Sequence, residues 1–119
     1  INNLTIDKSL NDCADLSFGK YKIINSKLNN CGDKGISVGE SSLVDINNVI
    51  IENSNTAIVS KDYSNVELSD SIINKTNTCF QAYNKKPEFA GGFLKVSKTK
   101  CNNFKKYVEV EASSKVVID

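Results

Sequence analysis

Charged and aromatic side chains that recur at a regular spacing are the first candidates for a binding site in this chain. Three dipeptides follow one another at intervals of 22 residues: Gly39-Glu40, Lys61-Asp62 and Tyr83-Asn84. If the backbone completes one turn per interval, they stack at one corner, and the stretch 84–92 then bulges out as a loop, held by Pro87 and hinged at Gly91-Gly92. Loops on a rigid scaffold often carry function. The candidate ligand-binding residues are Glu40, Lys61, Asp62, Tyr83, Lys85, Lys86, Glu88 and Phe89.

Such a corner suits contact with a glycan or a protein. The alternative is that its charges are solvated and form exposed ion pairs, each worth about 0–1 kcal/mol. In that case Phe89 folds back over the body of the protein.

Residues for catalysis are scarce. The chain has no His, which is the commonest general base and zinc ligand, and all 15 of its basic residues are Lys. The four cysteines contain no CxxC pair. We therefore predict no catalytic residue, no metal site and no cofactor, and an enzyme is the less favoured class.

Composition excludes several further classes. The chain has 119 residues, 39% of them hydrophobic and 24% charged, with a formal net charge of +1. This balance argues against a nucleic-acid partner and against disorder. No apolar run reaches about 18 residues, so membrane insertion is not expected. The length suits one domain, residues 1–119.

Internal repeats predict the fold. Apolar residues recur about every 22 positions in three columns, which we list in turn. The first is Ile24, Ile46, Leu68, Val96 and Ile118, with Ile6 preceding it. The second is Leu10, Leu28, Ile50 and Ile72, interrupted by Lys100, where we expect a shift that turns Cys101 inward. The third is Leu16, Ile36, Ile58, Phe80 and Val108, followed two positions later by Phe18, Val38, Ser60, Ala82 and Val110.

Each repeat contains three short alternating segments, as in Val44-Asp-Ile46 and Ile36-Ser-Val38. This layout predicts a right-handed parallel β-helix of about five coils, stacked about 4.8 Å apart. An 18-residue coil of the left-handed type does not fit the spacing, and a leucine-rich repeat needs more Leu. Asn30, Asn74 and Asn102, in a column with Asp12 and Glu52, are predicted to form tight bends and an amide ladder.

The cysteines are predicted to be buried free thiols. Cys13 and Cys31 are assigned equivalent places in adjacent coils, where a stacked thiol pair is favoured over a disulfide.

The V-x-I strand, Asn-rich bend and G-I-x-V strand resemble the repeat of the right-handed parallel β-helix, the pectate-lyase-like superfold. More narrowly, the stretches 33–40, 61–62, 79–86 and 88–92 resemble the terminal β-helix segments of uncharacterised secreted bacterial proteins. The catalytic motifs of polygalacturonase-like relatives, Asn-Thr-Asp, Asp-Asp, Gly-His-Gly and Arg-x-Lys, are not found in this sequence.

We therefore expect a non-catalytic extracellular or surface module for binding or structural display, and a segment or subunit of a longer solenoid. Two alternatives stay open. The first is a subunit that self-associates end to end into filaments, since Leu4-Thr-Ile6 and Val116-Val-Ile118 are assigned the same phase at the two ends. The second is a divergent polysaccharide lyase or hydrolase.

Overall fold

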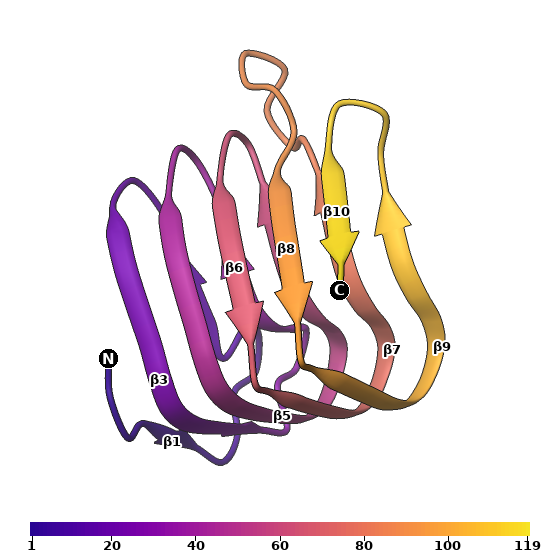
Figure 1. Cartoon of the computed structure of the whole chain (residues 1–119). Helices are drawn as coiled ribbons and strands as arrows, with labels where there is room; N and C mark the ends of the chain where they lie inside the picture. The colour runs from indigo at the N-terminus through magenta and orange to yellow at the C-terminus, as the bar shows by residue number, and fades with distance from the viewer.

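The protein is a right-handed parallel β-helix of about five coils, described by a computed structural model of residues 1–119. Figure 1 shows the coils side by side, from the N-terminal coil to the C-terminal one. The strands are β1 (Thr5–Ile6), β2 (Ala14–Leu16), β3 (Lys20–Asn29), β4 (Lys34–Val38), β5 (Leu43–Lys61), β6 (Asn65–Ser69), β7 (Ile72–Tyr83), β8 (Phe93–Ser97), β9 (Lys100–Val110) and β10 (Lys115–Ile118). The structure has no helix of the kind that could cross a membrane.

Each full coil has three faces, and every pairing between strands is parallel. The first face contains 20–24 of β3, 43–47 of β5, and the strands β6, β8 and β10. The second contains β1, 26–29 of β3, 49–52 of β5, 72–74 of β7 and 100–102 of β9. The third contains β2, β4 and the ends of β5, β7 and β9. We call the corner between the second and third faces the second bend, and the corner after the third face the third bend.

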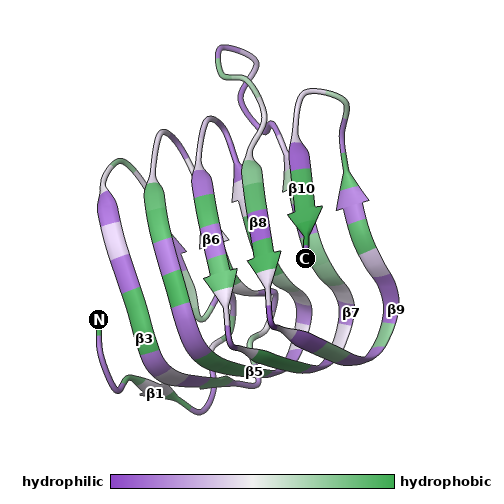
Figure 2. Ribbon diagram, in the orientation of Figure 1, coloured by the Kyte–Doolittle hydropathy of each residue, from purple (hydrophilic) through white to green (hydrophobic).

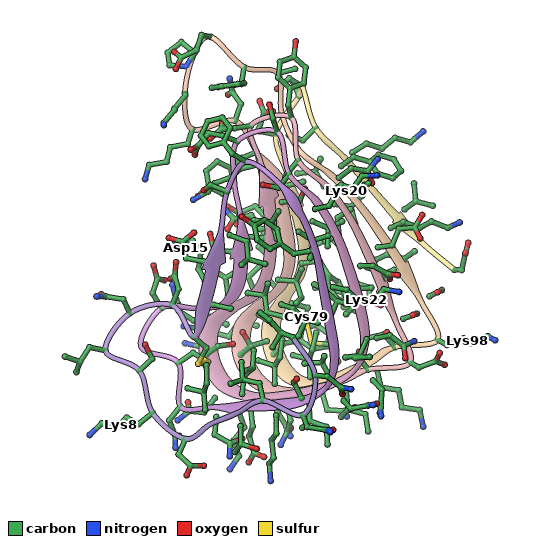
Figure 3. All side chains as sticks on the ribbon, turned by 90° about the vertical axis from the view of Figure 1, so that its left-hand side faces the viewer. Lys8, Asp15, Lys20, Lys22, Cys79 and Lys98 are labelled. Carbon is green, nitrogen blue, oxygen red and sulfur yellow. A yellow bond between two sulfur atoms is a disulfide. The ribbon has the colours of Figure 1, made fainter.

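The interior is a continuous column of apolar side chains. Eighteen buried residues form one cluster, and inward residues alternate with outward ones along each strand. Figure 2 shows this alternation as bands of opposite hydropathy on the strands. In Figure 3 Cys79 lies inside the tube, whereas Asp15, Lys20 and Lys22 point away from it.

The predicted columns need a correction of one residue in several coils. Ile23, not Ile24, pairs with Ile46. On the second face the inward column runs through Ile6, Leu28, Ile51, Ile73 and Cys101. Ile50 and Ile72 are 39% and 48% exposed, and Lys100 pairs with Ile72 in the same outward column. Lys100 therefore breaks no apolar ladder, and Cys101 faces inward without any shift of the coil.

The prediction for the first coil is also wrong. Ala14 pairs with Ile36 and Leu16 with Val38, whereas Phe18 is 64% exposed in the third bend. Leu10 is 86% exposed. Ile6 belongs to the second face, beside Leu28, whereas Ile118 belongs to the first face, beside Val96. The two terminal strands therefore do not share a phase, because the described chain enters the solenoid on the second face.

The bends use the left-handed backbone conformation, which Asn and Asp tolerate best. In the second bend, Asn30, Asn53, Lys75 and Asn103 have φ between 53° and 63°. Asn74 and Asn102 lie one position earlier, in a column with Asn29 and Glu52, so the predicted column mixed two neighbouring ones.

The predicted amide ladder is confirmed. Asn53 Nδ2 donates to Asn30 Oδ1 at 2.8 Å, and Asn48 Nδ2 donates to Asn25 Oδ1 at 2.7 Å. Each of these bonds links one coil to the preceding one.

The cysteine prediction is wrong, because both pairs are disulfides: Cys13 with Cys31 and Cys79 with Cys101. Their Cα atoms are 5.2 Å and 6.4 Å apart, a distance that a disulfide spans and that stacked coils provide. The paired cysteines do not occupy equivalent positions. Cys79 follows Gly35 and Ala57 in one column of the third face, whereas Cys101 follows Ile51 and Ile73 on the second face.

Candidate functional site

The predicted corner forms where the third face ends and the chain enters the third bend. Ser60 pairs with Val38 and Ala82, and Lys61 pairs with Tyr83, so the 22-residue spacing stacks these positions as predicted. Gly39, Lys61 and Tyr83 thus occupy one outward column. A Cβ atom on Gly39 would lie 3.2 Å from Lys61 Cε, so the lysine stem packs over the glycine of the preceding coil.

The loop 84–92 between β7 and β8 projects beyond the other bends (Figure 1). It is positioned by Asp62, whose side chain is completely buried. Asp62 Oδ1 accepts hydrogen bonds from Lys85 N at 2.7 Å and from Lys86 N at 3.0 Å. Its Oδ2 atom is buried and has no hydrogen-bond partner in the protein. Asp62 is therefore a clamp for the start of the loop.

Further contacts give the loop a defined shape. Asn84 Nδ2 donates to Phe89 O at 3.0 Å, and Phe89 N donates to Lys86 O at 3.1 Å. Lys86 Nζ lies 3.4 Å from Glu40 Oε2 of the coil two turns earlier. Neither Gly91 nor Gly92 has a positive φ; both lie so close to neighbouring residues that a Cβ atom would not fit. Close packing explains these glycines without a hinge, and no contact identifies Pro87 as what holds the loop.

An aromatic pair stands beside the loop. The rings of Tyr63 and Phe89 meet edge to face, with centroids 5.8 Å apart, and Tyr63 is 59% exposed. Tyr63 was not among the predicted site residues. It follows the Lys61-Asp62 pair directly and has a positive φ of 65°, which turns it outward at the bend. An aromatic residue beside that charged pair was the available signal.

Polar side chains near Tyr83 cover the outer surface of the third face. Burial of Tyr83 raises the pKa of its phenol, and Asp62 and Asp33 raise it further, against the opposing effect of Lys34. Asp33 accepts a hydrogen bond from Lys34 Nζ at 2.9 Å and another from Asn55 Nδ2 at 3.1 Å, and these bonds lower the pKa of its carboxyl group. Ser37 and Val59, which point outward here, are completely buried.

The predicted site residues divide into two groups. Asp62 is completely buried and Lys61 is only 8% exposed, so neither contributes to the exposed part of the corner. Half-buried Tyr83 and Glu40 lie at its edge. Lys85, Lys86 and Glu88 are exposed, and Phe89 is half-buried against Tyr63. We call Tyr63, Lys85, Lys86, Glu88 and Phe89 the loop surface.

A second feature was missed altogether. A hollow of about 410 Å³ lies on the outside of the second bend. It is lined by Asn53, Ser54, Lys75, Thr76, Asn77, Asn103, Phe104 and Lys105. Comparison of the chain with protein-family models, with curated proteins and with solved structures finds no match.

Proposed function

We propose that the protein is a non-catalytic extracellular or surface module that binds a protein partner through the loop surface. The observation that carries the proposal is the buried carboxylate of Asp62, which accepts hydrogen bonds from two backbone N–H groups of an exposed loop. Burial of a carboxylate is costly unless hydrogen bonds compensate it. A chain that needed only a connection between β7 and β8 would not require this clamp.

The shape of the loop surface favours a protein over a glycan. The loop projects from the third bend (Figure 1), and it carries exposed charges of both signs, Lys85, Lys86 and Glu88, near the aromatic pair Tyr63 and Phe89. Aromatic anchors of this kind insert into pockets of partner proteins and dominate binding energy. Small ligands and sugars are instead enclosed by concave sites. Two disulfides are compatible with an oxidising compartment, which supports an extracellular location.

The test is binding to an array of purified extracellular proteins and, in parallel, to an array of glycans. The double variant Tyr63→Ser/Phe89→Ala should lower affinity for the protein ligand by at least about thirtyfold, because a single buried aromatic anchor contributes about 2 kcal/mol or more. The matched control is Phe18→Ala. Phe18 is an exposed aromatic residue with a positive φ in the same bend, two coils earlier, and this variant should bind normally.

Asp62 gives a second, independent readout. Asp62→Ala should loosen residues 85–90, seen as faster amide hydrogen exchange, and weaken binding although its side chain touches no partner. Asp62→Asn keeps an Oδ1 acceptor and should bind almost normally. The proposal fails if the double variant binds like the control, or if the protein binds only glycans.

A further inference from the structure

The hollow on the second bend lies where three side-chain columns are interrupted. Register places Asn53, Lys75 and Asn103 in one column, and Ser54, Thr76 and Phe104 in the next. The third column contains Asn55, Asn77 and Lys105. Asn and small hydroxyl residues are the rule in these columns. Lys75, Phe104 and Lys105 are the exceptions, and all three line the same hollow.

Lys75 is the least expected of the three. Its φ is 58°, a conformation that Lys adopts less readily than Asn, and Asn occupies this position in the neighbouring coils. Neither Lys75 nor Lys105 has a carboxylate within 4.0 Å, so both ammonium groups are free to meet a ligand.

The amides of the hollow leave oxygen acceptors available. Asn77 Nδ2 donates to Asn55 Oδ1 at 2.8 Å, and Asn103 Nδ2 donates to Asn74 Oδ1 at 2.7 Å. Asn53 donates in the same direction, to Asn30. The Oδ1 atoms of Asn53, Asn77 and Asn103 accept no hydrogen bond from the protein. In the next coil, Lys75 follows Asn53 and Lys105 follows Asn77, so no amide is there to donate. These oxygens, and the second N–H of each amide, suit the hydroxyl groups of a sugar.

Phe104 provides an apolar wall. It is 42% exposed, and its ring lies against Tyr107, with centroids 5.4 Å apart; Tyr107 in turn packs on Phe80 at 5.5 Å. A ring held in this way offers a fixed apolar surface against which a sugar ring can lie. The hollow, of about 410 Å³, is open to solvent, so a ligand there can be part of a longer chain.

We propose that this hollow binds a sugar that carries a sulfate or phosphate ester. Lys75 and Lys105 come from different coils and different columns, so they present two separate positive charges to the hollow. The three terminal oxygens of a tetrahedral ester point in different directions, so they can meet two lysines and an amide that come from different columns, whereas the two oxygens of a carboxylate lie in one plane. The site lies on the second bend, apart from the loop surface, and the inference does not depend on the proposed function.

The experiment measures affinity by isothermal titration calorimetry at low ionic strength, with four probes. These are a sulfated chondroitin tetrasaccharide, the same chain without sulfate, a tetrasaccharide carrying mannose 6-phosphate, and inorganic sulfate. The protein should bind the two esters, and the tighter one identifies the natural ester. The unsulfated chain, which carries carboxylates only, and inorganic sulfate should bind at least tenfold more weakly.

The variants restore the residue type of each column: Lys75→Asn, Lys105→Asn and Phe104→Thr. Each lysine variant should lower affinity for the preferred ester about tenfold, the value of one charge-assisted hydrogen bond. The matched control is Lys98→Asn, since Lys98 also has a positive φ of 47° but lies in the bend between the first and second faces. This control and Tyr63→Ser/Phe89→Ala should leave affinity within twofold.

Four outcomes would overturn the proposal: neither ester binds, the unsulfated chain binds as tightly as the sulfated one, inorganic sulfate binds as tightly as the esters, or Lys75→Asn behaves like Lys98→Asn. The last result would reduce the interaction to general attraction by a basic surface. Loss of folding would not obscure the answer, because Asn is the better residue at the conformation of Lys75.

Discussion

At the scale of single residues, neighbouring side chains with the same chemistry have opposite roles in this fold. Ile50 and Ile51 are adjacent, yet Ile51 is 1% exposed and Ile50 is 39% exposed. Side chains alternate between the two sides of a strand, so an error of one residue in register reverses inside and outside. Periodicity found the column of the second face but placed it on the wrong one of two adjacent apolar residues.

The two isoleucines provide a direct test of the register. Ile51→Ala should lower the free energy of unfolding by about 2–5 kcal/mol, because it leaves a cavity in the core. Ile50→Ala should lower it by less than about 1 kcal/mol, since exposed substitutions have small effects. Urea denaturation of both variants measures the difference. Equal losses, or a larger loss for Ile50→Ala, would contradict the observed register.

Asp33 gives a prediction about pH. Its pKa is below the ordinary value of 3.8 in the folded protein, because Lys34 and Asn55 donate hydrogen bonds to it. The resulting stabilisation is present above the unfolded-state value and is lost as pH falls from there through the folded-state pKa. The variant Asp33→Asn removes this carboxyl group, and Lys34→Gln removes one of its two hydrogen-bond donors. Between pH 5 and pH 2, the free energy of unfolding should therefore fall less in either variant than in the wild type. Urea denaturation across that range checks this, and unchanged slopes would refute it.

At the scale of strands and coils, the two disulfides fasten the outer coils to their neighbours. Cys13–Cys31 joins the first coil to the second, and Cys79–Cys101 joins β7 of the fourth coil to β9 of the fifth. Two coils before Cys79 and Cys101, the same two columns contain Gly35 and Ile51. A Cβ atom on Gly35 would lie 2.9 Å from Ile51 Cγ2. Near the middle of the solenoid, Ile51 thus packs against Gly35 and fills the space that the disulfide Cys79–Cys101 fills near the C-terminal end.

Reduction should therefore loosen the ends before the centre. Each disulfide closes a loop of about 20 residues in the unfolded chain, and its loss should cost about 3 kcal/mol. Because backbone pairing joins each coil only to its neighbours, we expect the loss to be local. Amide hydrogen exchange with and without a reducing agent should show faster exchange in β1, β2 and β9, with β5 still protected. Uniform acceleration across all strands would contradict this.

At the scale of the whole molecule, the coils form a compact solenoid that measures 34 × 29 × 28 Å and presents separate outer surfaces. The loop surface projects from the third bend, and the hollow lies on the second bend, so the two proposed sites are carried on different corners of the same coils. Their independence follows from the architecture. Backbone hydrogen bonds and the apolar column hold each coil in place, and the two sites use side chains that lie outside this column.

The solenoid, the repeat length, the stacking of Lys61 on Tyr83 and the projecting loop can all be predicted from the order of the residues. These follow from spacing, because residues one coil apart must lie over one another. Only the tertiary structure decided which of two adjacent residues faces inward, as at Ile23 and Ile24, and that Asp62 is a buried clamp. It alone also decided that the cysteines pair, and that Lys75, Phe104 and Lys105 line one hollow. The physical reason is that small differences in bend length shift the register by one residue, and distances between columns arise only when the coils close.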